Sequence, residues 1–189
     1  MLFRVARKED GADLCRIYRP YVMETAITFI VKEPTAESFA EKISTLIPQY
    51  PFIVCEEDGR ALGYAYASAL RPHDAYQWDA ELSVYVDRDY HGQGIGRRLY
   101  AALLALLTLQ GYQTVYGVLS LPNEKSLALH KAFGFETLGI FPKSGYKLGK
   151  WHDIIWLQKT LGSFPSAPQP PMPFSRLDEK SVLQILENA

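Results

Sequence analysis

The stretch Tyr90–Tyr100, YHGQGIGRRLY, places three glycines within five positions, directly before a long apolar pattern. The preceding residues 80–86, AELSVYV, alternate between apolar and polar side chains as a strand does. After the stretch, apolar side chains recur at helical spacing from Ile95 onward, and Gly111 is placed to end that helix. The sequence therefore predicts a strand, a glycine-rich loop and a helix in direct succession.

The amides at the start of such a helix have no partner within the helix, and together with the helix dipole they bind anions. Glycine at positions 92, 94 and 96 opens the backbone to a phosphate group, and Arg97 and Arg98 add positive charge at the rim. The loop suits a ligand of pyrophosphate size. It lacks the Lys-Ser or Lys-Thr of a P-loop and the Gly-x-Gly-x-x-Gly of a dinucleotide-binding loop. A purely structural turn stays open as the alternative.

Composition limits the classes of partner. The chain has 189 residues and a formal net charge of −1, which favours one domain and argues against nucleic acid or a membrane surface as the ligand. Cys15 and Cys55 are far apart, and no apolar run has the length of a membrane span, so we expect a cytoplasmic protein. His73 and His152 have no acidic or cysteine neighbours at ligand spacing, so no metal site is predicted.

The hydrophobic periodicity predicts a mixed, mostly antiparallel sheet with helices packed on it, an α+β fold. Asp10, Thr35 and Asn123 are predicted to begin helices, and Asp58-Gly59 is predicted to turn a hairpin. The predicted helices cover 10–23, 35–47, 95–110 and 123–133. The predicted strands cover 2–7, the two arms of a hairpin within 51–70, 80–86, 114–120, 135–141 and 152–161, with a polar loop at 142–151.

The composition changes after Gly162. Residues 163–174 contain five prolines and are typical of an extended linker, and the following segment can form one short amphipathic helix. We therefore divide the chain into a domain at 1–161 and a proline-rich linker with a short helix at 162–189.

Three quoted segments carry a family resemblance. ELSVYVDRDYHGQGIGRRLYAALL (81–104) resembles the coenzyme A-binding motif of the GNAT N-acetyltransferases, and LSLPNEKSLALHKAFGFETLG (119–139) resembles the family's next motif. SGYKLGKWHDIIWLQKTL (144–161) is similar to the phosphinothricin and methionine sulfoximine acetyltransferase branch, as is Arg71-Pro72. The resemblance implies the three-layer GNAT fold around a twisted, mostly antiparallel sheet, acetyl-CoA as co-substrate, a small-molecule amine as acceptor, and a homodimer.

The resemblance also implies where acetyl-CoA binds. The pantetheine arm would lie where two neighbouring strands splay apart, the loop amides would hold the pyrophosphate, and an Asn amide would reach the arm. His91 stands where the family commonly has Gln or Arg, although a backbone amide is indifferent to that change. Structural roles are the alternatives for some of these residues: sheet core for residues 84–86, a helix cap for Asn123 and an exposed loop position for His91. The candidate cofactor-binding residues are Val84, Tyr85, Val86, His91, Gly92, Gln93, Gly94, Ile95, Gly96, Arg97, Asn123 and Ser126.

The implied chemistry is direct attack of an amine on a thioester, which needs a base because amines are usually protonated at neutral pH. Glu81 is the candidate base, with a strand charge or an ammonium anchor as the alternatives. His130 is the second candidate catalytic residue: it can protonate the thiolate only if cationic, and it can otherwise hydrogen-bond or pack near the cofactor. Neither cysteine lies in a motif, so no acetyl-enzyme is expected.

The acceptor site is expected around the acetyl end. Arg71 can grip a carboxylate with its guanidinium, although it is equally placed to be a solvated residue at the end of a hairpin. The other candidates are wall residues of the pocket, with core packing as the alternative for the aromatics. The candidate substrate-binding residues are Thr28, Phe29, Arg71, Tyr76, Glu81 and Lys147.

Two other functions stay open at this point. The same chemistry can serve another acceptor, such as a polyamine or a protein N-terminus, although Arg71 would repel a polyamine. A non-catalytic module that senses acyl-CoA is the alternative of a different class. It would bind acetyl-CoA normally, and changing Glu81 would alter nothing that could be measured.

Overall fold

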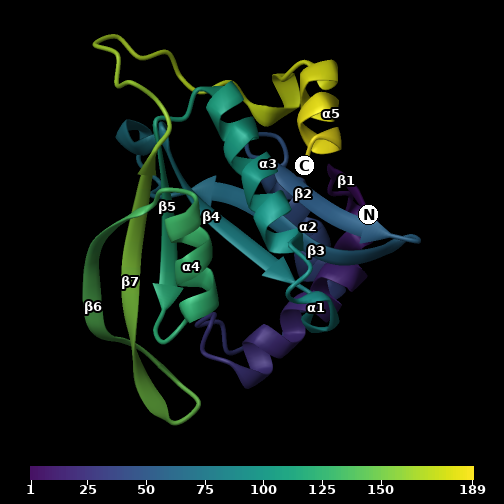
Figure 1. Ribbon diagram of the computed structural model, residues 1–189, viewed down its shortest axis with the longest axis vertical. Helices are drawn as coiled ribbons and strands as arrows, with labels where there is room; N and C mark the ends of the chain where they lie inside the picture. The colour runs from purple at the N-terminus through teal and green to yellow at the C-terminus, as the bar shows by residue number, and fades with distance from the viewer.

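The structure is a computed structural model that describes residues 1–189. Its centre is a twisted seven-stranded sheet in the order β1-β2-β3-β4-β5-β7-β6, with helices on both faces (Figure 1). All neighbouring strands run antiparallel except β4 and β5, which confirms the predicted α+β fold. The strands are β1 (Leu2–Val5), β2 (Phe52–Glu57), β3 (Arg60–Ala69), β4 (Asp79–Val86), β5 (Thr114–Ser120), β6 (Glu136–Lys147) and β7 (Lys150–Thr160).

The helices form the outer two layers. α1 (Gly11–Glu24) and α2 (Ala36–Leu46) pack on one face of the sheet in a core with Phe52 and Tyr64. α3 (Ile95–Gln110) packs on the other face in a core with Ile53 and Leu82, and α4 (Glu124–Ala132) lies beside it (Figure 1). Four short 3-10 turns lie at Lys8–Asp10, Asp74–Tyr76, Arg88–Tyr90 and Phe174–Arg176. No helix combines the length and the apolar character needed to cross a bilayer.

Local signals explain most element boundaries. The Thr35 side chain accepts a hydrogen bond from the amide of Ser38, which caps α2, and the Asn123 side chain caps α4 in the same way. Gly111 ends α3 with a φ of +92°. Asp58 and Gly59 both have positive φ, which is the geometry that a two-residue hairpin turn between twisted strands requires.

Two local predictions are wrong. Asp10 does not cap α1 with its side chain: its carboxylate instead forms an ion pair with Arg4 and accepts a hydrogen bond from the Arg7 amide. Residues 142–151 are not a loop, because β6 runs to Lys147 and β7 begins at Lys150. The turn lies at Leu148-Gly149. Pro142 and Gly145, which suggested a loop, are accommodated by a bulge in β6 between Phe141 and Gly145.

The most consequential feature of the sheet is a split between β4 and β5. These strands pair only where Asp79–Glu81 lies beside Thr114–Tyr116. Beyond that point β4 stays with β3, β5 stays with β7, and the two diverge. The facing edges of both strands therefore carry backbone groups that no neighbouring strand satisfies.

The C-terminal segment lies against the rest of the fold. It crosses one end of the sheet and places α5 (Glu179–Glu187) beside α3 and β1 (Figure 1). Phe174, Val182 and Leu186 are buried in the same core as α3. The Gln110 side chain donates hydrogen bonds to the carbonyls of Gln49 and Met172, which ties the segment to the end of α3.

Candidate active site

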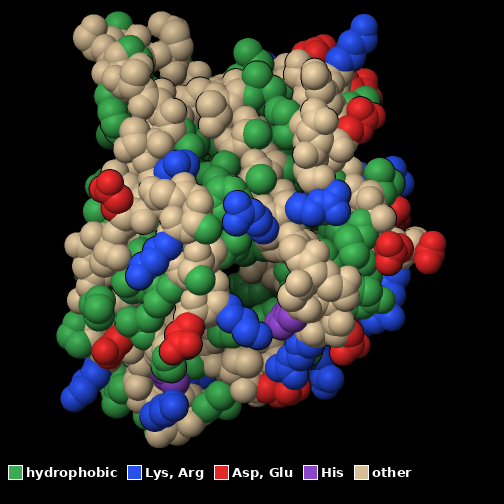
Figure 2. All heavy atoms as spheres, viewed as in Figure 1, with side chains coloured by type: hydrophobic (Ala, Val, Ile, Leu, Met, Phe, Trp, Pro, Cys, Tyr) green, Lys and Arg blue, Asp and Glu red, His purple; other side chains and the backbone are tan.

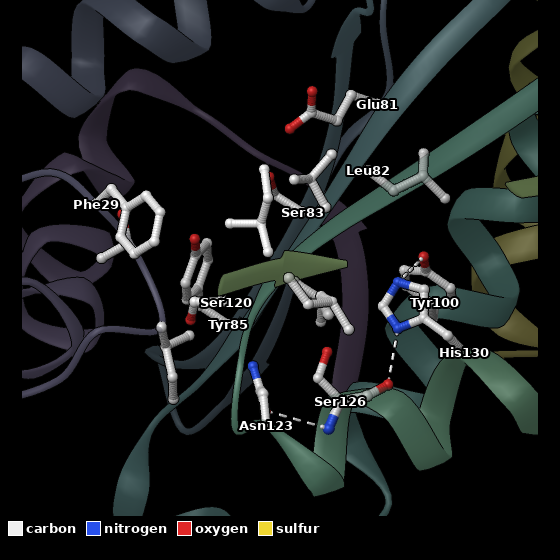
Figure 3. A pocket seen from close by; sticks show the side chains of 16 residues that line it. Phe29, Glu81, Leu82, Ser83, Tyr85, Tyr100, Ser120, Asn123, Ser126 and His130 are labelled. Carbon is white, nitrogen blue, oxygen red and sulfur yellow. Dashed lines mark hydrogen bonds between the residues drawn. The ribbon is translucent and has the colours of Figure 1, made fainter. Parts of the chain in front are cut away.

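The split between β4 and β5 holds a cavity of about 240 Å³ (Figure 3). Residues 81–85 of β4 and 118–120 of β5 form its two sides. The segment 27–29, which follows α1, closes one end. The side chains of Tyr100, Asn123, Ser126 and His130 reach it from α3 and α4. The cavity thus collects polar groups from five separate parts of the chain.

A second cavity of about 530 Å³ lies over the first turn of α3. Gly92, Gly94, Gly96 and Arg97 line it, and α4 forms the opposite wall. Figure 2 shows this face hollowed near its centre, with Lys and Arg side chains around the hollow. Both cavities share residue Asn123 and neighbouring lining residues, so they form one path from the start of α3 into the split sheet.

The start of α3 presents free amide groups to the second cavity. Gly92 and Gly94 have φ of +82° and +79°, and neither has an atom near the position of a Cβ. The amides of residues 92–94 donate to no backbone carbonyl. Gly94 is the N-cap residue of α3 and has no side chain that could cap the helix. Because the first-turn amides of a helix are also unpaired, this cradle suits an anion with several oxygens.

Of the two arginines that follow, only one faces the cavity. Arg97 lines it, with its guanidinium carbon 5.6 Å from the centre of the Phe133 ring. Arg98 points the other way: its guanidinium lies 4.4 Å from the Phe3 ring and donates a hydrogen bond to the backbone oxygen of Ala189. The prediction that both arginines lie at the rim is therefore wrong for Arg98, because successive helix residues point about 100° apart.

The His91 side chain is exposed and lies against Tyr21 and the end of β4. Its Nε2 lies 2.8 Å from the Tyr21 hydroxyl and 3.1 Å from the Val86 carbonyl oxygen. The single Tyr21 hydroxyl proton is donated to Val86, at 2.6 Å, so Nε2 of His91 carries a hydrogen and acts as the donor. The Val86 carbonyl is thus occupied within the protein, whereas the side of β4 facing the split stays open at Val84.

Asn123 serves two functions by geometry. Its Oδ1 accepts a hydrogen bond from the Ser126 amide at 3.4 Å and caps α4 (Figure 3). Its Nδ2 has no partner within the protein, and the residue lines both cavities. Ser126 also lines both cavities. The cap orients the amide so that its donor is available to a ligand.

His130 is buried and held from both sides (Figure 3). Its Nδ1 lies 2.7 Å from the Ser126 carbonyl oxygen and its Nε2 lies 2.8 Å from the Tyr100 hydroxyl. Because a carbonyl only accepts, Nδ1 carries the hydrogen. Burial lowers the pKa of His130, against the Ser126 hydrogen bond that raises it. The ring packs over Gly117 of β5, where a Cβ would lie 2.4 Å from Nε2.

Glu81 lies at the point where β4 and β5 part, and its carboxylate lines the split. Burial raises the pKa of the Glu81 carboxyl above its ordinary value of 4.5, against the positive charges of Arg71 and Lys42, which lower it. No hydrogen bond to another side chain or to the backbone contributes to that shift. A half-buried carboxylate without a partner is poised to accept a proton.

The expected acceptor residues separate into two groups. Thr28 and Phe29 line the split, together with Glu81. Arg71 does not line the split; its positive charge lowers the pKa of Glu81, and its guanidinium carbon lies 5.8 Å from the centre of the Trp156 ring. Tyr76 and Lys147 are not among the lining residues: Tyr76 is exposed on a 3-10 turn, and Lys147 donates to the Thr28 carbonyl from behind, at 2.7 Å.

Sequence reasoning missed several residues of the cavity. Tyr100 falls on the apolar face of α3, where its spacing is that of any core residue. Ser83 and Ser120 face the split only because β4 and β5 diverge there. Of these residues, only Ser120 could have been found from the sequence, because it ends a strand just before Asn123. The chain holds no group of three or more His, Cys, Asp or Glu side chains arranged for a metal ion.

Known proteins with similar sequences are acetyltransferases. A family model described as an acetyltransferase (GNAT) domain matches residues 3–156. A phosphinothricin N-acetyltransferase of Streptomyces viridochromogenes is 33% identical over 174 residues, which is 92% of this chain and 94% of that protein. An L-methionine sulfoximine/L-methionine sulfone acetyltransferase of Pseudomonas aeruginosa strain PAO1 is 36% identical over 120 residues, 63% of this chain and 70% of that protein.

Solved structures are similar over most of the chain. A GNAT superfamily phosphinothricin acetyltransferase from Sinorhizobium meliloti, in complex with AcCoA, matches with a TM-score of 0.84 and 34% identity. That match covers 88% of this chain and 92% of the other. A Salmonella typhimurium acetyltransferase with its cofactor acetyl-CoA matches with a TM-score of 0.85 and 29% identity, over 89% of this chain and 98% of the other.

Proposed function

Because the chain belongs to the GNAT acetyltransferase family, we propose that it acetylates the primary amine of a small amino acid-like molecule of the phosphinothricin, methionine sulfoximine or methionine sulfone type. The protein is an N-acetyltransferase, and acetyl-CoA is its co-substrate. The observation that carries the acceptor class is the unpartnered Glu81 carboxylate at the mouth of the split, with the cationic Arg71 beside it.

The residues present fit acetyl-CoA. The free amides at residues 92–94 and the first turn of α3, with Arg97 beside them, suit a pyrophosphate. The unpaired edge of β4 at Val84 and the free Asn123 amide suit the peptide-like pantetheine arm. When bound, acetyl-CoA supplies the activated acyl group.

This chain's own residues supply the proton transfer and orientation. Glu81 accepts the proton from the acceptor ammonium and so frees its lone pair. Arg71 holds the acceptor carboxylate, which orients the amine toward the split. Thr28 and Phe29 form the wall that faces Glu81 and exclude water from it. Lys147 supports this wall from outside, because its ammonium donates a hydrogen bond to the Thr28 carbonyl.

We also propose a cytoplasmic homodimer that binds neither nucleic acid nor membrane. Leu138, Ile140, Phe141, Tyr146 and Trp151 of the β6–β7 hairpin are exposed at the edge of the sheet, and such apolar surface is typical of a subunit contact. The two cysteines are free, as in a reducing compartment. Light scattering on the purified protein measures the oligomeric state, and a monomer at micromolar concentration would contradict the dimer.

The decisive experiment follows thiol release from acetyl-CoA with phosphinothricin, methionine sulfoximine, spermidine and a peptide N-terminus in parallel. We expect turnover with the first two. Glu81→Gln should lower kcat by about 10²–10⁴-fold without changing the Kd of acetyl-CoA. Asp79→Asn, on the same face of β4 but outside the cavity, is the matched control and should leave kcat unchanged.

Other outcomes separate the rival functions. Turnover only with spermidine or the peptide would retain the chemistry and overturn the acceptor class. Tight binding of acetyl-CoA without acetylation of any amine, and without any effect of Glu81→Gln, would favour a sensing module.

A further inference from the structure

We propose that Lys42 binds a second anionic group of the acceptor, so that the enzyme prefers amino acids whose side chain carries an acidic group. This inference rests on the proposed function, in which the acceptor amine lies at Glu81. It adds a subsite, on the far side of Glu81 from Arg71, to the site described above.

A groove lies beside Lys42, on the β3 side of Glu81. It has a volume of about 360 Å³, and Ser68 of β3, Tyr66 of β3 and Lys42 of α2 line it. Ser68 is the cross-strand partner of Glu81. Directly opposite residues of antiparallel strands share one face of the sheet, with Cβ atoms about 5 Å apart. The groove therefore begins beside the Glu81 carboxylate and runs toward α2.

Lys42 is a cation without an acidic partner. Its ammonium donates a hydrogen bond to the Tyr66 hydroxyl at 2.5 Å and lies 4.1 Å from the centre of the Tyr66 ring. The ion pairs of the protein involve five arginines and the N-terminal amine, and none includes Lys42. Its charge acts on Glu81, whose pKa it lowers. An anionic group of a ligand would supply the acidic partner that the Lys42 ammonium lacks within the protein.

The two cations lie on opposite sides of Glu81. Lys42 is over Tyr66 of β3, and Arg71 is over Trp156 of β7. The strand order β3-β4-β5-β7 places Glu81, on β4, between them. The side chains share one face, because Tyr66 is paired with Ser83, Glu81 with Tyr116, and the Tyr116 ring lies 6.4 Å from that of Trp156.

This arrangement matches a particular chemical class. An acceptor with its ammonium at Glu81 can direct its α-carboxylate to Arg71, whose planar fork suits a carboxylate. Its side chain then extends along Ser68 to Lys42. A lysine is a compact point charge with three donors, which suits a phosphinate, phosphonate or carboxylate without demanding one geometry. The Lys42 subsite thus favours phosphinothricin-type acceptors over methionine sulfone, whose side chain is neutral.

The test compares phosphinothricin with methionine sulfone at saturating acetyl-CoA. Lys42→Met keeps the apolar stem over Tyr66 and removes the charge. We expect it to raise the KM for phosphinothricin by about tenfold or more, because a lost charged hydrogen bond is worth roughly 1.5–3 kcal/mol. The KM for methionine sulfone should stay unchanged, and Lys42→Arg should restore most of the phosphinothricin affinity.

Lys180→Met is the matched control, because it makes the same substitution at an exposed lysine of α5, away from the groove. It should leave the KM for both acceptors no higher than in the wild type. An unchanged Kd for acetyl-CoA shows that each variant is folded. Equal increases of both KM values in Lys42→Met, or no increase of either, would overturn the assignment.

Failure of the proposed function would look different. The wild type would then acetylate neither amino acid. Calorimetric titration of phosphinothricin into the enzyme still tests the groove in that case: weaker binding to Lys42→Met supports the subsite, and equal binding overturns it.

Discussion

The Tyr100 hydroxyl lies 2.8 Å from Nε2 of His130, on the opposite side of the ring from the Ser126 carbonyl at Nδ1, and the two contacts together fix the tautomer of the imidazole. Nδ1 donates to the Ser126 carbonyl, so Nε2 can only accept while the ring is neutral. The ring is buried and its pKa is lowered by that burial. His130 therefore holds no proton aimed at the split sheet, which favours a neutral hydrogen-bonding role over that of an acid.

Tyr100→Phe should raise the pKa of His130. The change removes a donor that favours the neutral imidazole and leaves Nε2 free to take a proton. Nitrogen-15 NMR of the ring measures this: the wild type should show the Nδ1–H tautomer at neutral pH, and the variant should begin to ionise at higher pH than the wild type. Identical titrations in both proteins would contradict the assignment.

Gly117→Ala should destabilise the protein by about 1–3 kcal/mol, because the added methyl would overlap a packed group. The new Cβ would lie 2.4 Å from Nε2 and 2.7 Å from Cδ2 of His130, and hydrogen bonds on both sides keep that ring in place. Urea unfolding measures the loss. Gly139→Ala is the control, because no atom lies within 4 Å of its Cβ position. Equal stability of the two variants would show that His130 moves freely.

The acid limb of the pH profile should report Glu81. Burial raises the pKa of this carboxyl above 4.5, so kcat/KM should rise with pH as the carboxylate forms. Arg71 lowers that pKa, and its removal in Arg71→Ala should shift the limb to higher pH. Lys150→Ala, at the exposed end of β7, is the control for loss of a charge. A limb that stays in place or moves to lower pH would exclude Glu81 as its source.

Phe174→Ala should lower the free energy of unfolding by about 3 kcal/mol, the usual effect of removing a buried phenyl ring. Phe174 is 7% exposed and packs in the core that contains α3. Phe164, in the same proline-rich segment, is 59% exposed, so Phe164→Ala should change little. Thermal or urea unfolding of the two variants tests whether residues 162–189 fold with the domain. A similar small effect for both would mean that the segment is a separate appendage.

The sequence alone determined the elements and their order. Alternation defined the strands, and the turn at Asp58-Gly59, the cap at Thr35 and the stop at Gly111 each act within a few residues. The free amides at residues 92–94 were also predictable, because unpaired amides at a glycine-rich helix start are a local property. These features depend on interactions between residues close together in the chain, so short sequence patterns predict them.

Only the tertiary structure decided which of these groups meet. It turned Arg98 to the C-terminal residues and left Arg97 at the cavity, and it extended β6 and β7 through a segment that looked like a loop. It also joined Tyr100 to His130 and placed Lys42 and Arg71 on either side of Glu81. These relations depend on the divergence of β4 from β5 and on helix packing across the sheet. Such contacts join residues far apart in the chain, and no short pattern records them.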